Sequence, residues 1–543
     1  MVRRGQAPRP HRLAAVPGLM RPTGGSWPNL PAMSDTPSSD SGPPQDHGHL
    51  AELMAERRAK LDRLVAAGID PFPVGLRVPD RIGAVRGAWD DRLEPGEDSG
   101  AAVTVGGRLV ARRGHGKLAF LVLAEGSDHL QAMVQLDRVG PDTMERVADL
   151  DVGDWLVVSG TVLRSRRGEL SIGADEVTLA GKALRPLPDR WYGLRDTDTR
   201  FRQREVDLAV NDDARRVFAI RHRVLAALRT ELTERDYIEV ETPILHPIPG
   251  GAAAKPFVTH HNALDTDLYL RIAPELYLKR LVAGGMTRVF EINRSFRNEG
   301  LSPRHNPEFT MLESYEAFAD YHDVMALTQA LVQRAAEAAG GGHQRTYGGR
   351  AVDLGGTWPR RTVLALVQEA TGEDDLGYTT PVARLRELCT RSGITVQPAW
   401  GAGRLVLELY EELVEHTLWE PTFVLDYPVE VSPLARRHRD RPEVTERFEL
   451  IVVGRELANA FSELTDPDDQ RTRFEAQALI KAGGDEEAMG VDEAYLRAME
   501  LGMPPMGGLG IGVDRLVMLL ADVHTIRDVI LFPTLRPEQP PAP

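Results

Sequence analysis

Cysteine is almost absent from this 543-residue sequence. The single cysteine, Cys389, excludes an internal disulfide framework and any zinc cluster built from cysteines. Nothing in the cysteine content therefore indicates an oxidising compartment, and we expect a cytoplasmic protein.

Long apolar runs are also missing. No run approaches the roughly 20 residues that a membrane-spanning helix needs, and the segment 13–20 is short and interrupted by proline. We expect a chain that neither spans a membrane nor is secreted. The first stretch, MVRRGQAPRPHR, is basic like a transit peptide, but its prolines and glycine disfavour an amphipathic helix. A true start further along, for example at Met33, is an alternative.

Positive charge is in deficit. The chain has 65 Lys and Arg against 80 Asp and Glu, a formal charge of -15. Because phosphate contacts depend on lysine and arginine, any nucleic-acid site must be a local basic patch.

The length and the 42% hydrophobic content allow more than one core. Residues 1–46 are rich in Pro, Gly, Ser and Arg without apolar periodicity, which predicts a disordered tail. Apolar residues near helical spacing from His49 to Ala67 predict a helix, within an N-terminal helix and connector at 47–100.

Between residues 101 and 182 the pattern changes to five β-rich runs separated by Gly, Asp and Ser. This predicts a small five-stranded barrel of the oligonucleotide-binding (OB) type. A linker at 183–200 precedes a long mixed α and β region at 201–537, which begins with a helical stretch at 213–235. A short tail, 538–543, follows.

The segment from Val289 to Glu316 predicts two strands joined by a polar loop. Charged side chains that could grip a polyphosphate gather on the loop: Arg297, Glu299, Arg304 and His305. Phe309 offers a stacking face. A solvated hairpin with surface ion pairs is the alternative.

The segment FELIVVGRELANAFSEL carries Glu449 and Glu456, seven residues apart, followed by Asn459, Phe461 and Glu463. An extended strand gives alternate residues a common face. Two inward carboxylates need a cation between them, and oxygen ligands suit magnesium held against phosphates. The alternative is that each glutamate pairs with an arginine such as Arg447 or Arg455.

A third segment, GGLGIGVDRLVMLLADV, predicts a glycine-rich strand that leads into a helix with Arg515 near its start. The spacing of Gly508, Gly510 and Gly512 does not match a dinucleotide-binding fingerprint. Two remoter segments, IPGGAAAKPF and RIAPELYLKRLVAGG, add Gly251 and Glu275 as possible ligands.

Together these segments resemble the class II aminoacyl-tRNA synthetases, and specifically the lysyl enzymes, from about residue 49 to 537. ERDYIEVETPIL is similar to the first family motif, with Pro243 at a dimer interface; FRNEG through HNPEFTMLE is similar to the second; GLGIGVDRL is similar to the third. The resemblance implies an α+β multidomain fold: an anticodon-binding OB barrel, plus an antiparallel sheet flanked by helices that works as a homodimer.

The resemblance also implies an activity. Lysine would react with ATP to give lysyl-adenylate and pyrophosphate, and lysine would then pass to the 3'-terminal ribose of tRNA(Lys). The implied partners are tRNA(Lys), lysine, ATP and Mg2+, with neither a membrane nor DNA.

Residue roles follow from the same resemblance. Arg297 and Arg515 would be catalytic, and Glu449 and Glu456 would bind magnesium. The implied ATP-binding residues are Arg297, Glu299, His305, Asn306, Phe309, Glu449, Glu456 and Arg515, with adenine between Phe309 and Arg515. The implied lysine-binding residues are Gly251, Glu275, Arg297, Glu313, Tyr315, Asn459, Phe461 and Glu463.

For the barrel, the resemblance implies an anticodon site. Its residues would be Arg112, Arg113, Phe120, Gln131 and Glu169, with Phe120 stacked on a base. The alternative is that Phe120 belongs to the barrel core.

Three other functions remain open. A lysyl transferase that modifies a translation factor would lack the barrel, and lysyl-lipid synthesis would need a membrane segment. A non-catalytic RNA-binding relative would have lost motif residues, yet Arg297, Glu449, Glu456 and Arg515 are all present.

Overall fold

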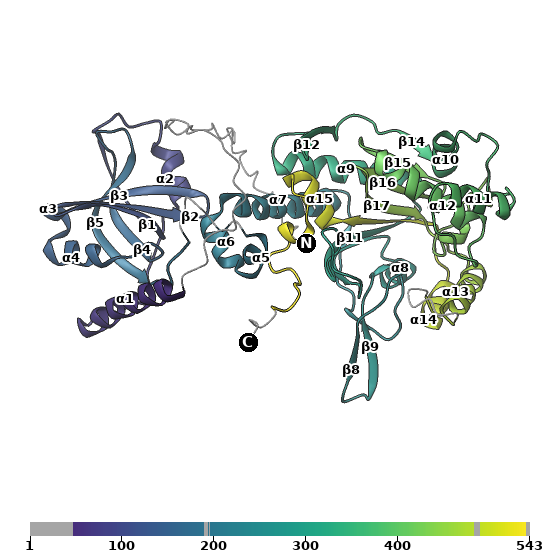
Figure 1. Cartoon of the computed structure of the whole chain (residues 1–543), viewed down its shortest axis with the longest axis horizontal. Helices are drawn as coiled ribbons and strands as arrows, with labels where there is room; N and C mark the ends of the chain where they lie inside the picture. The colour runs from purple at the N-terminus through teal and green to yellow at the C-terminus, as the bar shows by residue number, and fades with distance from the viewer. Residues whose placement is uncertain (1–46, 189–193, 195, 483–488, 539–543) are drawn as a thin grey trace, which may run out of the picture.

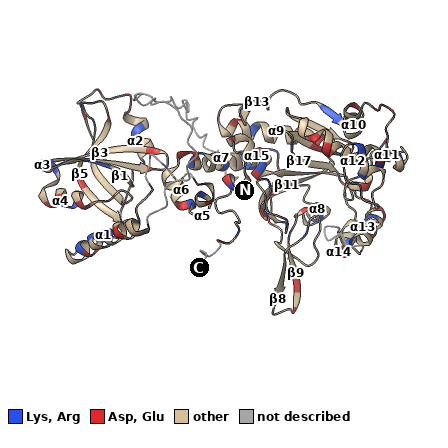
Figure 2. Ribbon diagram, viewed as in Figure 1, with Lys and Arg blue, Asp and Glu red and all other residues tan. Residues whose placement is uncertain are grey.

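The computed structural model describes residues 47–188, 194, 196–482 and 489–538. The predicted tail at 1–46 and nearly all of the tail at 538–543 lie outside the described residues. Figure 1 shows a barrel at one end of the molecule and a larger domain, built around a sheet, at the other. Figure 2 shows that acidic and basic residues are distributed over both.

The N-terminal part contains the predicted barrel. Helices α1 (His47–Ala66) and α2 (Ile82–Trp89) precede it. Its strands are β1 (Asp98–His115), β2 (Leu118–Glu125), β3 (Asp128–Gln135), β4 (Trp155–Arg164) and β5 (Leu170–Gly181), with α3 (Leu136–Val139) and α4 (Pro141–Asp149) between β3 and β4. The strands close in the order β1-β2-β3-β5-β4, which confirms the five-stranded barrel. The barrel begins at Asp98 rather than at residue 101.

The large domain is built on an eight-stranded sheet in the order β14-β15-β16-β17-β18-β11-β10-β6. These strands are β6 (Ile238–Glu239), β10 (Arg288–Phe296), β11 (Glu308–Ala317), β14 (Arg360–Thr362), β15 (Thr422–Leu425), β16 (Arg447–Val452), β17 (Arg455–Ser462) and β18 (Met506–Gly512). From β15 to β10 every neighbouring pair is antiparallel, as predicted. The two edge pairs, β14 with β15 and β6 with β10, are parallel, so the sheet is mixed.

Three helices cover one face of this sheet: α7 (Asp212–Glu234), α9 (Tyr321–Ala339) and α15 (Val513–Ala521) (Figure 1). They share one hydrophobic core with the strands, in which Val224, Leu331 and Leu516 meet Leu312 of β11. Because successive side chains of a strand alternate between faces, Glu313 points away from this core. The face opposite the three helices is therefore free to carry polar chemistry.

The remaining elements lie around this framework. They are α5 (Thr197–Arg202), α6 (Arg204–Val210), β7 (Leu245–His246), β8 (Val258–His261), β9 (Thr266–Leu270), α8 (Glu275–Ala283), β12 (Gln344–Tyr347), β13 (Arg350–Asp353), α10 (Val363–Thr371), α11 (Val382–Arg391), α12 (Ala402–Leu413), η1 (Glu415–Thr417), η2 (Val429–Val431), α13 (Pro467–Ala482), α14 (Glu493–Glu500) and α16 (Ile526–Val529). Cys389 of α11 is buried in a core shared with α10 and α12 and has no disulfide partner. Within the described part of the chain, no helix has the length and hydropathy that a membrane span requires.

Candidate active site

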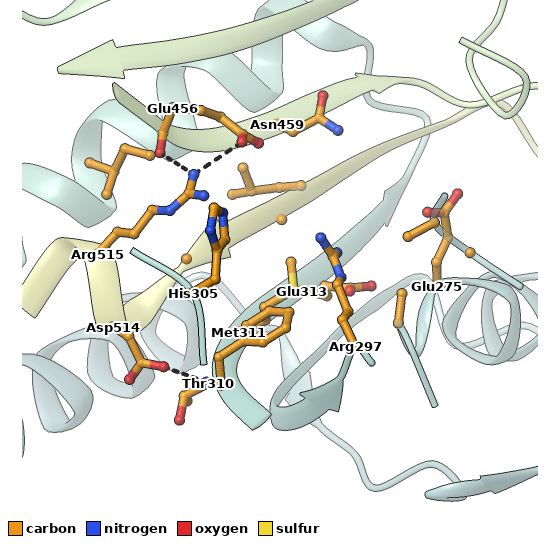
Figure 3. A pocket seen from close by; sticks show the side chains of 18 of the residues that line it. Glu275, Arg297, His305, Thr310, Met311, Glu313, Glu456, Asn459, Asp514 and Arg515 are labelled. Atoms are coloured by element: carbon orange, nitrogen blue, oxygen red, sulfur yellow. Dashed lines mark hydrogen bonds and ion pairs between the residues drawn. The ribbon is translucent and has the colours of Figure 1, made fainter. Parts of the chain in front are cut away.

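A cavity lies on the polar face of the large sheet (Figure 3). Strands β11, β17 and β18 form its floor, and the 297–307 loop and the starts of α8 and α15 form its walls. Fourteen residues predicted for the site line it: Gly251, Glu275, Arg297, Glu299, His305, Asn306, Phe309, Glu313, Tyr315, Glu456, Asn459, Phe461, Glu463 and Arg515. Arg304 of the same loop lines it as well. Glu449 is not among the lining residues.

The segment that carries Glu449 and Glu456 is a hairpin, so the expectation of one extended strand was wrong. β16 and β17 are antiparallel, and Val453 and Gly454 form the turn between them. Two residues separated by an odd number of positions would face opposite sides of a single strand. The hairpin and its register shift after Leu450 instead place Glu449 opposite Asn459 and Glu456 opposite Ile451.

The two glutamates interact electrostatically across this hairpin. Burial, and then repulsion from Glu456, raise the pKa of Glu449 to about 7, although Arg447 opposes the shift. Glu449 pairs with Arg447 at 2.6 Å, one of the two arginines named as alternative partners. Glu456 pairs with Arg515 at 3.1 Å and not with Arg455. Arg455 instead donates a hydrogen bond to the Tyr347 hydroxyl.

This donor set fits magnesium only with help from a substrate. Among the described residues, no group of three His, Cys, Asp or Glu side chains could hold a metal ion by itself. Two carboxylates completed by phosphate oxygens and water are a common arrangement for Mg2+. Burial and repulsion between the two carboxylates, which raise the pKa of Glu449, favour a bound cation beside them.

Arg297 lies between the two ends of the cavity. In Figure 3 it separates Arg515, His305 and Glu456 at one end from Glu275 at the other. Its Nε is buried without a hydrogen-bond partner among the described residues, and its guanidinium lies 5.0 Å from the centre of the Phe309 ring. Burial lowers the pKa of Arg297. A buried guanidinium with unused donors is suited to bind an anion.

Phe309 and Arg515, the two residues predicted to hold adenine, both line the cavity. Phe309 is covered on one side by Arg297, and the Arg515 guanidinium donates to Glu456 at both the carboxylate and the main-chain carbonyl. Asp514 fixes the start of α15 on the sheet, because its carboxylate accepts hydrogen bonds from the Thr310 amide at 2.7 Å and from Arg221 at 2.5 Å. That anchor holds the neighbouring Arg515 at the cavity (Figure 3).

The opposite end of the cavity is acidic and buried. Glu275, Glu313 and Glu463 are buried there beside Tyr315, whose hydroxyl donates to Glu313 at 3.2 Å. Burial, followed by repulsion from Glu275, raises the pKa of Glu313 to about 8. Such a pocket suits a cationic ligand.

Sequence reasoning missed two residues at this end. Lys279, one turn after Glu275 on α8, is fully buried and pairs with both Glu275 and Glu463. The i,i+4 spacing of Glu275 and Lys279 was the available signal. Gly508 on β18 leaves the space that Glu463 fills, because a Cβ there would lie 1.9 Å from Glu463 Oε1.

The barrel residues fall into two groups. Phe120 lies between buried Ala119 and Leu121 and is itself only partly buried, so it points away from the core. Arg113 is its cross-strand partner, and Gln131 shares its face through Met133. Gln131 donates to Ser171, close to the exposed Glu169. Arg112 is separate, because it donates to Val147 and Ala148 at the end of α4.

Two family models match the chain. The model of class II tRNA synthetases (D, K and N) matches residues 196–536, and that of the OB-fold nucleic acid binding domain matches residues 103–180. The chain therefore belongs to the class II tRNA synthetases, and the predicted OB fold is confirmed.

Curated relatives narrow this class. A lysine–tRNA ligase of Magnetococcus marinus is 49% identical over 489 residues, covering 90% of this chain and 97% of the relative. One of Moorella thermoacetica is 50% identical over 488 residues, covering 90% and 98%, and one of Carboxydothermus hydrogenoformans is 47% identical over 495 residues, covering 91% and 99%. Within its class, the chain is thus a member of the lysine–tRNA ligase family, as the motifs predicted.

Proposed function

We propose that this cavity converts lysine and ATP to lysyl-adenylate with release of pyrophosphate, and then transfers the lysyl group to tRNA(Lys) with release of AMP. The observation that carries the proposal is Arg297, which lies between a basic, aromatic end and an acidic end and whose buried Nε has no hydrogen-bond partner in the part of the chain that the structure describes. A nucleotide fits the first end and an ammonium group the second. The α-carboxylate of lysine and the α-phosphate of ATP then meet at Arg297.

In this mechanism the protein positions groups and stabilises charge. Arg297 binds the carboxylate and the α-phosphate and stabilises the charge that develops as the carboxylate attacks in line. Phe309, His305 and Arg515 hold the nucleotide. Glu449 and Glu456 would hold Mg2+, which would supply positive charge to neutralise the phosphates.

Lysine selection is assigned to the acidic end. Glu275, Glu463 and Tyr315 surround the ε-ammonium, and Asn459, Phe461, Glu313 and Gly251 complete the pocket. A buried ammonium needs such anionic company. The outward face with Arg113, Phe120 and Gln131 binds the anticodon through stacking and base-edge hydrogen bonds.

We also propose a cytoplasmic homodimer. Ile238, Ile244, Leu245 and Val258 are exposed apolar residues in and around the first motif, on both sides of Pro243. Exposed apolar clusters of this kind are typical of protein interfaces. Sedimentation of the purified protein tests this point, and a monomer at micromolar concentration would contradict it.

The first experiment is ATP–pyrophosphate exchange by purified protein with magnesium and each of the twenty amino acids, followed by charging of tRNA(Lys). We expect exchange with lysine alone and charging of the tRNA. Exchange without charging would favour the transferase that modifies a protein. No exchange at all would favour a non-catalytic relative.

A further inference from the structure

The lysine pocket contains a lysine of its own. Lys279 Nζ lies 2.5 Å from Glu275 Oε1 and forms a second close ion pair with Glu463 Oε2. It is fully buried and lies 5.4 Å from the centre of the Phe461 ring. The roles proposed above for the residues of the cavity do not include Lys279.

The charges around Lys279 can be counted. Glu275 and Glu463 place two carboxylates against the one ammonium of Lys279. Burial raises the pKa of both carboxyl groups, and their attraction to Lys279 opposes that rise. Burial, and then repulsion from Glu275, raise the pKa of Glu313 to about 8, so it is mainly protonated at neutral pH. Tyr315 and Tyr495 are neutral phenols, because burial raises the pKa of each. With both carboxylates ionised opposite one ammonium, the pocket carries one negative charge.

One carboxylate oxygen remains available for a ligand. Glu463 Oε1 has no hydrogen-bond partner among the described residues. It lies on the side of Gly508, which lines the cavity. Burial alone would lower the pKa of Lys279, but attraction to Glu275 and Glu463 outweighs this effect and raises it, so Lys279 keeps its charge.

We propose that Lys279 is a specificity-determining residue that acts through Glu275 and Glu463: it permanently neutralises one of their two charges, so that the pocket is balanced by a side chain with one positive charge. The inference rests on the proposed function and adds a residue to it. An uncharged or acidic side chain of similar length leaves a buried charge without compensation, which is costly.

The test removes charges in pairs and measures the KM for lysine in pyrophosphate exchange. Glu275→Gln alone gives a neutral pocket, so the KM should rise about 10- to 100-fold through loss of a charged hydrogen bond. Adding Lys279→Met restores one negative charge. The KM for lysine of the double variant should therefore be about tenfold or more lower than that of Glu275→Gln alone. A residue with a merely structural role cannot give this reversal, because its removal would weaken binding further.

A buried lysine elsewhere provides the matched control. Lys182 in the barrel is also buried and pairs with two carboxylates, Asp151 and Asp154. Lys182→Met in the Glu275→Gln background should not lower the KM for lysine. The same comparison can be made at the other carboxylate, with Glu463→Gln alone and together with Lys279→Met. Thermal unfolding checks that each variant is folded.

An uncharged analogue gives a second measurement that keeps Lys279 in place. 6-Hydroxynorleucine has a hydroxyl where lysine has its ammonium. The ratio of its inhibition constant to the KM for lysine should be lower in Glu275→Gln, whose pocket is neutral, than in the wild type. A KM that is unchanged or higher in both double variants, with no change in analogue preference, would overturn the role of Lys279 alone. Absence of lysine-dependent exchange in the wild type would overturn the proposed function itself.

Discussion

Arg447 donates a hydrogen bond from Nε to the amide oxygen of Asn459 at 3.0 Å. The same guanidinium contacts Glu449 at 2.6 Å and Ser432 at 3.0 Å, and it lies 4.4 Å from the centre of the Tyr427 ring. One arginine therefore fixes a proposed lysine ligand and a proposed magnesium ligand. These two residues are also directly opposite each other on β16 and β17.

Arg447→Met should weaken lysine and magnesium binding together. Loss of charge-assisted hydrogen bonds frees both Asn459 and Glu449, so we expect the KM for lysine and the magnesium concentration for half-maximal exchange each to rise about tenfold or more. Arg455→Met on the same hairpin, which loses a hydrogen bond and a ring contact with Tyr347, is the control. A change in one of the two quantities without the other would argue against the shared anchor.

Arg297→Ala should abolish adenylate formation and leave the chain folded. Charge stabilisation of this kind contributes several kcal/mol, so exchange should fall by at least about a thousandfold. Arg384 is only partly buried and pairs with Glu373 and Asp375, so the control Arg384→Ala should have little effect. Unchanged exchange in Arg297→Ala would remove the basis of the mechanism.

Two glycines of β18, Gly508 and Gly510, differ in how closely the side chains of the lysine pocket approach them. An added Cβ at Gly508 would lie 1.9 Å from Glu463 Oε1 and 2.7 Å from the Tyr315 ring, whereas at Gly510 it would meet the flexible end of Met311 at 3.3 Å. Gly508→Ala should therefore raise the KM for lysine about tenfold or more by displacing Glu463, and Gly510→Ala should raise it less. Equal effects of the two substitutions would mean that Gly508 does not shape this pocket.

Magnesium binding should depend on pH through Glu449. Its raised pKa, about 7, means that a bound proton competes with the metal below neutral pH. Between pH 7 and pH 6, magnesium affinity should fall up to about tenfold, and above pH 8 it should level off. Calorimetric titration with magnesium and a non-hydrolysable ATP analogue measures this, and Glu449→Gln, which cannot titrate, should bind magnesium more weakly without this slope.

Local pattern explains which features were predictable. The β10 and β11 hairpin is contiguous, so its turn residues and alternation already placed Arg297, Phe309 and Glu313 on one unit. The Glu449 and Glu456 pair needed the turn at Val453 and Gly454, because a single strand would have separated them.

Other features depend on contacts that no local pattern contains. Glu463 contacts Lys279 of α8 and faces Gly508 of β18, and both contacts exist only after the sheet has assembled. The parallel edge strands of the sheet follow likewise from its assembly, because β6 and β14 are too short to have a clear periodicity.

A substitution in the barrel should impair tRNA recognition without affecting amino-acid activation. Phe120→Ala removes a ring from the outward face, and loss of base stacking costs about 1–3 kcal/mol. The KM for tRNA(Lys) should therefore rise roughly 5- to 150-fold, while lysine-dependent pyrophosphate exchange without tRNA stays unchanged. Trp155, an exposed aromatic residue on β4, provides the control, because Trp155→Ala removes a ring that lies over Arg108 outside the proposed anticodon face. If both substitutions raised the KM for tRNA equally, the effect would reflect the barrel's stability and not stacking by Phe120, and the anticodon site would have to lie elsewhere on the barrel.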